Sequence, residues 1–364
     1  MRAVIIGFSH MHVNEIAQYI NDCEGFDLVG IAEVPSTVET IPALRYTPVW
    51  NFENVRDNFC KNTYDDYRVM LDELKPDFAF ILTENCQKPE VVEECAKRGV
   101  NVCIEKPMAV SLAEAEKIEA SVKRYGIEAV VNWPVLWRPY LHRMKAAIDS
   151  GLVGDPIRLR YLNGHTGPLG KGARHRGVSS AAEEMQDSDR AKTWWHNADH
   201  GGGNLLDIGC YGCLFTEWFL GEGAESVLAY GAELNTPFGN TEDNFAAIIG
   251  FGGKKMSVIE GTWTTPAAAI PSGPMLTGTN GSIICTGTAG NNPDLVAYDI
   301  SGNPLEIPAV DLGRAYANMP EHLMHRARTG APLQKMVTLE ENMKVIRLLD
   351  TVVRAASSHK TEEV

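Results

Sequence analysis

Residues 3–17 read AVIIGFSHMHVNEIA and place an apolar run, a glycine and a helix-like pattern one after another. The run at 3–6 indicates a buried strand, and apolar residues at helical spacing over 12–21 indicate an amphipathic helix. A strand that enters a helix through a glycine turn is how dinucleotide-binding folds begin, with backbone N–H groups directed at a pyrophosphate. Of the three glycines in the G-x-G-x-x-G pattern only the first is present, because Ser9 and His12 replace the others.

An acidic residue follows the second predicted strand at about the distance that a ribose contact requires. Glu33 lies 26 residues after Gly7, and no arginine adjoins it to accept a 2′-phosphate. We therefore expect NAD in preference to NADP. The alternative is a tight turn that binds nothing, in which His10 and His12 only start the helix instead of donating hydrogen bonds to the cofactor.

Strand and helix patterns alternate along the first 132 residues and change character afterwards. Further short strands are expected at 26–31, 78–82, 101–104 and 129–132, with helical stretches between them. Longer strands are expected at 155–164, 225–234, 243–251 and 256–264, and later helices at 207–220, 316–329 and 338–357. The first pattern is typical of a mainly parallel α/β sheet, and the second of an α+β domain.

Two stretches lack regular periodicity. Residues 34–63 contain three prolines and one short predicted helix near Val55, and residues 165–203 are rich in glycine, histidine and charge. A loop as long as the second one, inside a compact domain, is usually functional or mobile.

The bulk composition of the 364-residue chain excludes several kinds of partner. Lys and Arg number 33 against 47 Asp and Glu, a formal net charge of −14, which argues against nucleic acids and anionic membranes. No apolar run reaches the roughly 18 residues that span a bilayer, and the N-terminal run is too short for a signal peptide. Eight cysteines are too sparse for a disulfide scaffold, so we expect a cytoplasmic protein.

Two further segments carry side chains that can move protons. Residues 105–107 read EKP at the end of a buried strand, which places Lys106 at the carboxyl edge of the sheet, where ligands bind. In segment 201–211, GGGNLLDIGCY, Asp207 and Tyr211 are four residues apart and share one helix face. Opposite Lys106 they form a proton-handling set in which the lysine charge lowers the tyrosine pKa. Taken singly, each has a structural alternative: a surface lysine, an N-cap aspartate and a core tyrosine.

Together, the glycine turn, the EKP segment and the GGG…D-x-G-x-Y block resemble the glucose–fructose oxidoreductase/inositol dehydrogenase/rhizopine catabolism (Gfo/Idh/MocA) family. The resemblance covers nearly the whole chain. It implies an α/β Rossmann domain over 1–132 and, over 133–364, an α+β domain with a large, open-faced, mostly antiparallel sheet. It also implies NAD(P)-dependent oxidation or reduction of sugars, inositols and polyols. The family's catalytic lysine and aspartate fall on Lys106 and Asp207, and its proton-relay position, most often histidine, is Tyr211.

The resemblance extends to the residues around a bound cofactor. Residues 83–87, TENCQ, stand where the family usually carries T-P-N or T-P-x and a histidine, so Glu84 adds negative charge there. We expect the cofactor to contact Gly7, Ser9, His10, His12, Glu33, Thr83, Asn85, Glu105 and Lys106. Residues 132–138, NWPVLWR, correspond to the family's N-x-R-F region and make Trp137 and Arg138 candidates for the wall of the substrate pocket.

The histidines of segment 165–203 allow two interpretations. His196 and His200 are four apart, a spacing that suits metal ligands on a helix, but no catalytic acid motif accompanies them. We therefore expect no metal, and we expect His165, Trp195 and His196 to line the substrate cleft.

These observations predict an NAD-dependent oxidoreductase that transfers hydride between the nicotinamide and a carbinol carbon of a sugar, glycoside or cyclic polyol. The alternative is a non-catalytic member that senses nucleotides or binds proteins, favoured by the degraded turn and Glu84. Metal-dependent hydrolysis at the histidine-rich loop is the weakest hypothesis.

The open face of the second-domain sheet needs a cover. We expect Val227, Leu228, Tyr230 and Trp263 to face solvent there, and such an apolar surface predicts a homodimer or homotetramer packed through the sheet.

Overall fold

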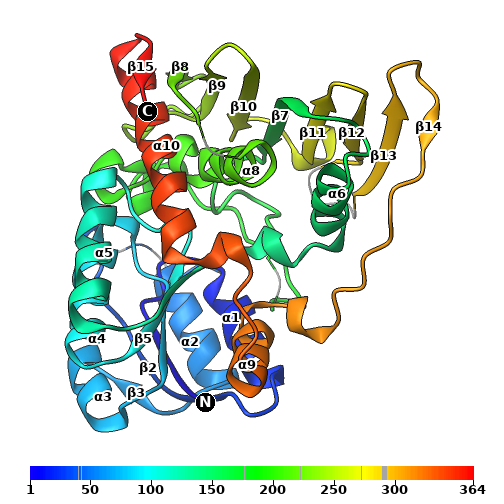
Figure 1. Cartoon of the computed structure of the whole chain (residues 1–364). Helices are drawn as coiled ribbons and strands as arrows, with labels where there is room; N and C mark the ends of the chain where they lie inside the picture. The colour runs from blue at the N-terminus through cyan, green and yellow to red at the C-terminus, as the bar shows by residue number, and fades with distance from the viewer. Residues whose placement is uncertain (40, 42, 176, 222, 272, 289–292) are drawn as a thin grey trace.

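Two sheets organise the computed structural model, which describes residues 1–364 except 40, 42, 176, 222, 272 and 289–292 (Figure 1). The first sheet is parallel throughout and has the order β3-β2-β1-β4-β5-β6. Its strands are β1 (Arg2–Ile6), β2 (Asp27–Ala32), β3 (Thr63–Tyr64), β4 (Phe78–Ile81), β5 (Asn101–Glu105) and β6 (Ala129–Asn132). The helices of this domain are α1 (Val13–Asp22), α2 (Pro48–Asn58), α3 (Tyr67–Leu74), α4 (Lys88–Lys97) and α5 (Leu112–Tyr125).

The strand order reverses beside β1, which lies between β2 and β4. In open α/β sheets the ligand crevice lies at such a reversal, beyond the carboxyl ends of the strands. Gly7 leaves β1 there with φ +81°, and a Cβ at this position would lie 2.5 Å from Thr83 Cγ2. A glycine is therefore required at the mouth of the predicted cofactor site.

The second sheet has the order β14-β13-β12-β11-β7-β10-β9-β8-β15 and is antiparallel except where β7 pairs with β10. Its strands are β7 (Pro156–Gly164), β8 (Ser226–Ala232), β9 (Asn244–Phe251), β10 (Lys255–Thr262), β11 (Gly273–Gly278), β12 (Gly281–Thr286), β13 (Asp294–Asp299), β14 (Pro304–Leu305) and β15 (Glu362–Glu363). The expected fold class, a Rossmann-type parallel sheet followed by a mostly antiparallel sheet, is thereby confirmed.

Helices cover one face of the second sheet and join it to the first domain (Figure 1). They are α6 (Pro139–Asp149), α8 (Cys210–Leu220) and α10 (Leu339–Ser358). Helix α9 (Met319–Thr329) lies against the first domain, and a short helix, α7, spans Asp187–Arg190. The indole of Trp133, just after β6, donates a 2.8 Å hydrogen bond to Asn342 of α10. Helix α9 contacts α1, so the last helices of the chain pack back on the first domain.

The opposite face of the second sheet is exposed and partly apolar. Its exposed apolar residues include Leu228, Tyr230, Ile248, Met256, Met275 and Tyr298. Val227 and Trp263, however, are buried, so the expectation that they face solvent is wrong. Along β8 the side chains alternate, and Val227 and Ala229 point inward while Leu228 and Tyr230 point outward.

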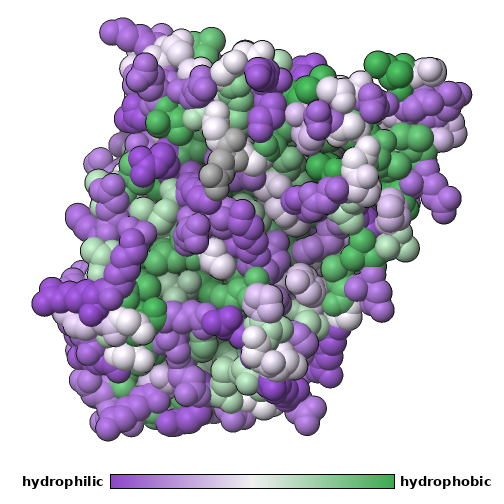
Figure 2. Space-filling model, in the orientation of Figure 1, coloured by the Kyte–Doolittle hydropathy of each residue, from purple (hydrophilic) through white to green (hydrophobic). Residues whose placement is uncertain are grey.

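Hydrophilic residues cover most of the first domain in the view of Figure 2, and hydrophobic ones reach the surface near the β13–β14 end. No helix among the described residues is long and apolar enough to cross a membrane. The irregular segment 34–63 contains α2 around Val55 as expected; residues 40 and 42 within it lie outside the described residues.

Candidate functional site

Lys106 and Asp207 form a buried ion pair between the two domains. Lys106 follows β5, and Asp207 lies in the π-helical turn Leu205–Gly209 that leads into α8. The lysine Nζ lies 2.8 Å from Asp207 Oδ1, and the lysine is 2% exposed. Burial opposes the lysine's charge, yet the Asp207 carboxylate holds the Lys106 pKa well above its usual value. Burial alone would raise the Asp207 pKa, but Lys106 holds it well below its usual range.

Two further side chains fix the Asp207 carboxylate. The indole Nε1 of Trp263 donates to Asp207 Oδ2 at 3.2 Å, and Nε2 of His165 lies 3.5 Å from the same oxygen. His165 follows β7, and its side chain is 38% exposed. An imidazole that is partly open to solvent therefore adjoins the buried pair.

Tyr211 presents its ring to the lysine. Lys106 Nζ lies 4.6 Å from the ring centroid, and Trp133 packs edge-on against the other side at 5.6 Å. Burial raises the pKa of the Tyr211 hydroxyl, and the Lys106 charge only partly offsets this. The lysine charge lowers the tyrosine pKa as expected, but burial outweighs it, so the net direction is upward.

Two backbone N–H groups hold Glu33, one from the glycine turn and one from the residue that follows Glu33. Its Oε1 accepts hydrogen bonds from Phe8 N–H at 3.1 Å and Val34 N–H at 2.9 Å. Burial raises the pKa of Glu33 to about 8. The carboxyl group thus lies beside the turn, where a ribose-binding acid belongs.

A cavity of about 200 Å³ lies beside this turn. It is lined by residues from the turn, the segment after β2 and the 165–203 segment, among them Ser9, Ser36, Tyr46, Trp194 and Trp195. The Trp194 indole donates to the Ser9 carbonyl at 3.1 Å and closes one side. This volume is below the roughly 300–1,000 Å³ of drug-sized ligand sites. The cavity is therefore smaller than a whole dinucleotide requires.

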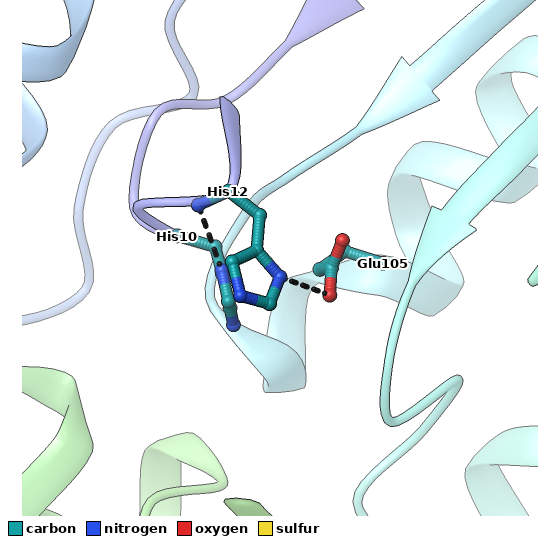
Figure 3. A group of neighbouring side chains, drawn as sticks. All are labelled: His10, His12 and Glu105. Carbon is teal, nitrogen blue, oxygen red and sulfur yellow. Dashed lines mark hydrogen bonds and ion pairs between the residues drawn. The ribbon is translucent and has the colours of Figure 1, made fainter. Parts of the chain in front are cut away.

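His10, His12 and Glu105 gather at the carboxyl ends of β1 and β5 (Figure 3). His12 Nδ1 lies 2.9 Å from Glu105 Oε1, and the Asn132 amide donates to Oε2 at 2.8 Å. His12 N–H donates to His10 Nδ1 at 3.2 Å, whereas His10 Nε2 is buried with no partner among the described residues. Burial, followed by the neighbouring His12, lowers the His10 pKa well below its usual value. His175, which the sequence did not single out, packs against His12 at 6.2 Å between ring centroids.

Lys88 is a second buried lysine that sequence reasoning missed. Its ammonium donates three hydrogen bonds of 2.7 Å, to Asn85 Oδ1 and to the carbonyls of Glu105 and Pro107. Burial lowers the pKa of Lys88 to about 7. Asn85 in turn donates to the Gly201 carbonyl at 2.7 Å. This chain of contacts fixes the EKP segment against the glycine-rich segment that carries Asp207.

Glu84 is turned toward the segment after β2. It is fully buried and accepts hydrogen bonds from the Ser36 hydroxyl at 2.5 Å and from Thr37 N–H at 3.2 Å. His200 Nδ1 lies 3.7 Å from the carboxylate. The Glu84 carboxylate, which stands where the family usually carries a proline, is thus bound by Ser36 and Thr37 and lies near His200.

Other predicted substrate residues are placed apart from the ion pair. Trp137 packs against His322 of α9, with ring centroids 5.3 Å apart, and Arg138 precedes α6 as its N-cap residue. His196 is buried between Phe238 and Trp263, and burial lowers its pKa to about 3.

Trp195 stacks on Trp194 with ring centroids 3.8 Å apart and also contacts His10 at 5.0 Å. It therefore lies over the glycine turn, on the cofactor side of the site.

Comparison with known proteins covers both domains. Residues 1–132 match the family model described as oxidoreductase family, NAD-binding Rossmann fold, and residues 141–284 match the GFO/IDH/MocA C-terminal domain. The trans-1,2-dihydrobenzene-1,2-diol dehydrogenase of Xenopus tropicalis is 23% identical over 258 residues, 70% of each chain. The scyllo-inositol 2-dehydrogenase (NAD(+)) of Bacillus subtilis is 26% identical over 174 residues, 48% of this chain and 44% of the relative. The aldose-aldose oxidoreductase structure from Caulobacter crescentus has a TM-score of 0.75 at 18% identity and covers 100% of this chain and 99% of that one.

Proposed function

Since the chain belongs to the Gfo/Idh/MocA family of NAD-binding oxidoreductases, we propose that its Lys106–Asp207 pair acts on a carbinol of a sugar, glycoside or cyclic polyol. The observation that carries the proposal is the 2.8 Å contact that keeps a buried lysine charged at the edge of the Rossmann sheet. Relatives named as diol and inositol dehydrogenases support the substrate class. A non-catalytic role is disfavoured, because it gives no reason to keep a charged lysine buried there.

The cofactor is NAD, which supplies the acceptor or donor of hydride when it is bound. Gly7, Ser9 and Glu33 would hold its adenosine half; Ser9 lines the cavity, and Glu33 accepts a hydrogen bond from Phe8 N–H in the turn. The residues after Glu33 are Val34, Pro35, Ser36 and Thr37, which offer no cation for a 2′-phosphate.

Lys106 binds and polarises the reacting oxygen. As the substrate is oxidised, its hydroxyl oxygen gains negative charge, and a preorganised ammonium stabilises that charge in a buried site. Asp207 keeps Lys106 protonated and fixes its direction, because the carboxylate is itself held by Trp263 and His165.

We assign to His165 the transfer of the proton of the substrate hydroxyl. Its Nε2 adjoins Asp207, and its partial exposure gives the proton a route to solvent. Tyr211 is less suited to proton transfer, because burial raises the pKa of its hydroxyl. Its ring instead lies against the ammonium of Lys106 and positions that lysine. The test is a pH profile of kcat/KM with a responsive sugar or polyol. Loss of its limiting acid–base step in His165→Asn supports the assignment; loss in Tyr211→Phe alone returns the role to the tyrosine.

The exposed sheet face is the proposed contact between copies of the chain. It carries Leu228, Tyr230 and Ile248 in an apolar patch that a monomer would leave in water. A homodimer or homotetramer packed face to face would bury it, and light scattering at micromolar concentration tests this.

All eight cysteines are free thiols, which supports a cytoplasmic location.

A further inference from the structure

We propose that His10, His12 and Glu105 form a binding site for one divalent transition-metal ion, beside the Lys106–Asp207 pair. Two histidines and one glutamate are a donor set that zinc uses in proteins, with room for a water or substrate oxygen as a further ligand. The atoms that these three residues offer all lie within 4.8 Å of one another. Small side-chain movements would therefore bring them onto a single ion.

Burial separates this cluster from a chance surface grouping. His10 is 2% exposed and Glu105 is 1% exposed. The Nε2 atom of His10 has no partner among the described residues, although a buried polar atom normally has one. The His10 Nδ1 atom accepts a long hydrogen bond, 3.2 Å, from His12 N–H. The His10 ring can lose this bond when its proton moves from Nε2 to Nδ1, and Nε2 is then free to bind a metal.

The carboxylate of Glu105 is oriented as a ligand would be. One oxygen faces His12 Nδ1 at 2.9 Å (Figure 3). The other accepts a hydrogen bond from the Asn132 amide at 2.8 Å. Outer-shell hydrogen bonds of this kind hold ligating carboxylates in metal sites. Glu105 is also buried, and its side-chain partners are an imidazole and an amide.

Each of the two buried lysines near this corner is bound by partners of its own. Lys106 is paired with Asp207, and the Lys88 ammonium binds three oxygens, two of them backbone carbonyls. The other cluster with metal-ligating residues, Glu84, Cys86 and His200, is different. Unlike His10, neither Glu84 nor His200 has a buried nitrogen or oxygen atom without a hydrogen-bond partner among the described residues.

The test is metal binding by the full-length protein, stripped with a chelator and titrated with Zn²⁺ or Co²⁺ alone, without NAD or substrate. We expect one equivalent per chain and visible d–d absorption with Co²⁺. Glu105→Gln and His12→Asn should abolish both signals, and Asn132→Ala should weaken binding about 10–100-fold, as loss of an outer-shell partner does. Cys86→Ser is the matched control and should bind as the wild type does.

Three results would overturn the proposal: no stoichiometric binding by the wild type, unchanged binding in Glu105→Gln, or loss of binding in Cys86→Ser. Circular dichroism confirms the fold of each variant, and the nearly isosteric Glu105→Gln decides the case if His12→Asn does not fold. Because neither NAD nor substrate is present, a negative result leaves the proposed oxidoreductase function standing.

Discussion

Replacing Asp207 by asparagine should lower the free energy of unfolding by an amount that follows from the geometry of the buried ion pair. The carboxylate lies 2.8 Å from the ammonium of Lys106, which is 2% exposed and has no access to bulk water for its charge. Asparagine keeps the shape and the acceptor oxygen but removes the negative charge. The lysine is then a buried, uncompensated cation, and removal of one partner from a buried pair costs about 3–5 kcal/mol.

The pH dependence of this cost has a definite sign. In the wild type the Lys106 pKa is raised, so its stabilisation is present below the unfolded pKa of about 10.4 and is lost as pH rises through the folded value. The Asp207 pKa is lowered, so its stabilisation is present above about 4 and is lost as pH falls through the folded value. In Asp207→Asn, burial makes the folded lysine prefer its neutral form, and the deficit should shrink as pH rises from 7 toward 10.

Urea unfolding of the wild type, Asp207→Asn and the double variant Lys106→Met/Asp207→Asn measures the effect. The single variant should lose about 3–5 kcal/mol, and the double variant should recover a large part because no charge remains buried. A loss below about 1 kcal/mol, the value of an exposed pair, would refute the reasoning. So would a double variant less stable than the single one.

Three further changes probe other parts of the account. Gly7→Ala adds a Cβ 2.5 Å from Thr83 at a φ of +81°, so the melting temperature should fall by an amount equivalent to more than about 1 kcal/mol; an unchanged melting temperature contradicts the turn geometry. His165→Asn should lower kcat by about 10²–10⁴-fold with the fold intact, and turnover near the wild-type level would remove His165 from proton transfer. Leu228→Asp places a charge on the exposed sheet face and should reduce the mass measured by light scattering, whereas an unaltered assembly would exclude that face as the interface.

Much of the first domain was predictable from local pattern. Its central strands are buried on both faces, so each reads as a continuous apolar run, as FAFI does at Phe78–Ile81. Lys106 and Asp207 could be found because each lies in a short motif at a strand or helix end. Their pairing joins positions 101 residues apart, so no local pattern fixes it; the chemistry of the side chains suggested it, and the resemblance to a family supported it.

The missed residues share a physical reason. Lys88 begins a helix with the sequence KPEVVEECAK, in which it looks like an ordinary solvated lysine, and its three partners come from other segments. The assignment of Val227 to the open face failed because Val227 and Leu228 are both apolar. The alternation of side chains along a strand then does not show which of the two residues faces the core, and a shift of one residue exchanges the two faces. Trp263 follows directly after β10, and its role depends on contact with Asp207, which no local pattern reveals.

Hydride transfer by the wild type and by a Lys106 variant decides whether Lys106 acts on the substrate. Wild type and Lys106→Met, each shown to be folded and titrated with NAD, would be mixed with a panel of sugars, glycosides and cyclic polyols while reduced nicotinamide is followed by fluorescence. The account predicts NAD binding by both proteins and substrate-dependent reduction by the wild type alone. Equal reduction by the two proteins, or no NAD binding by the wild type, would contradict it.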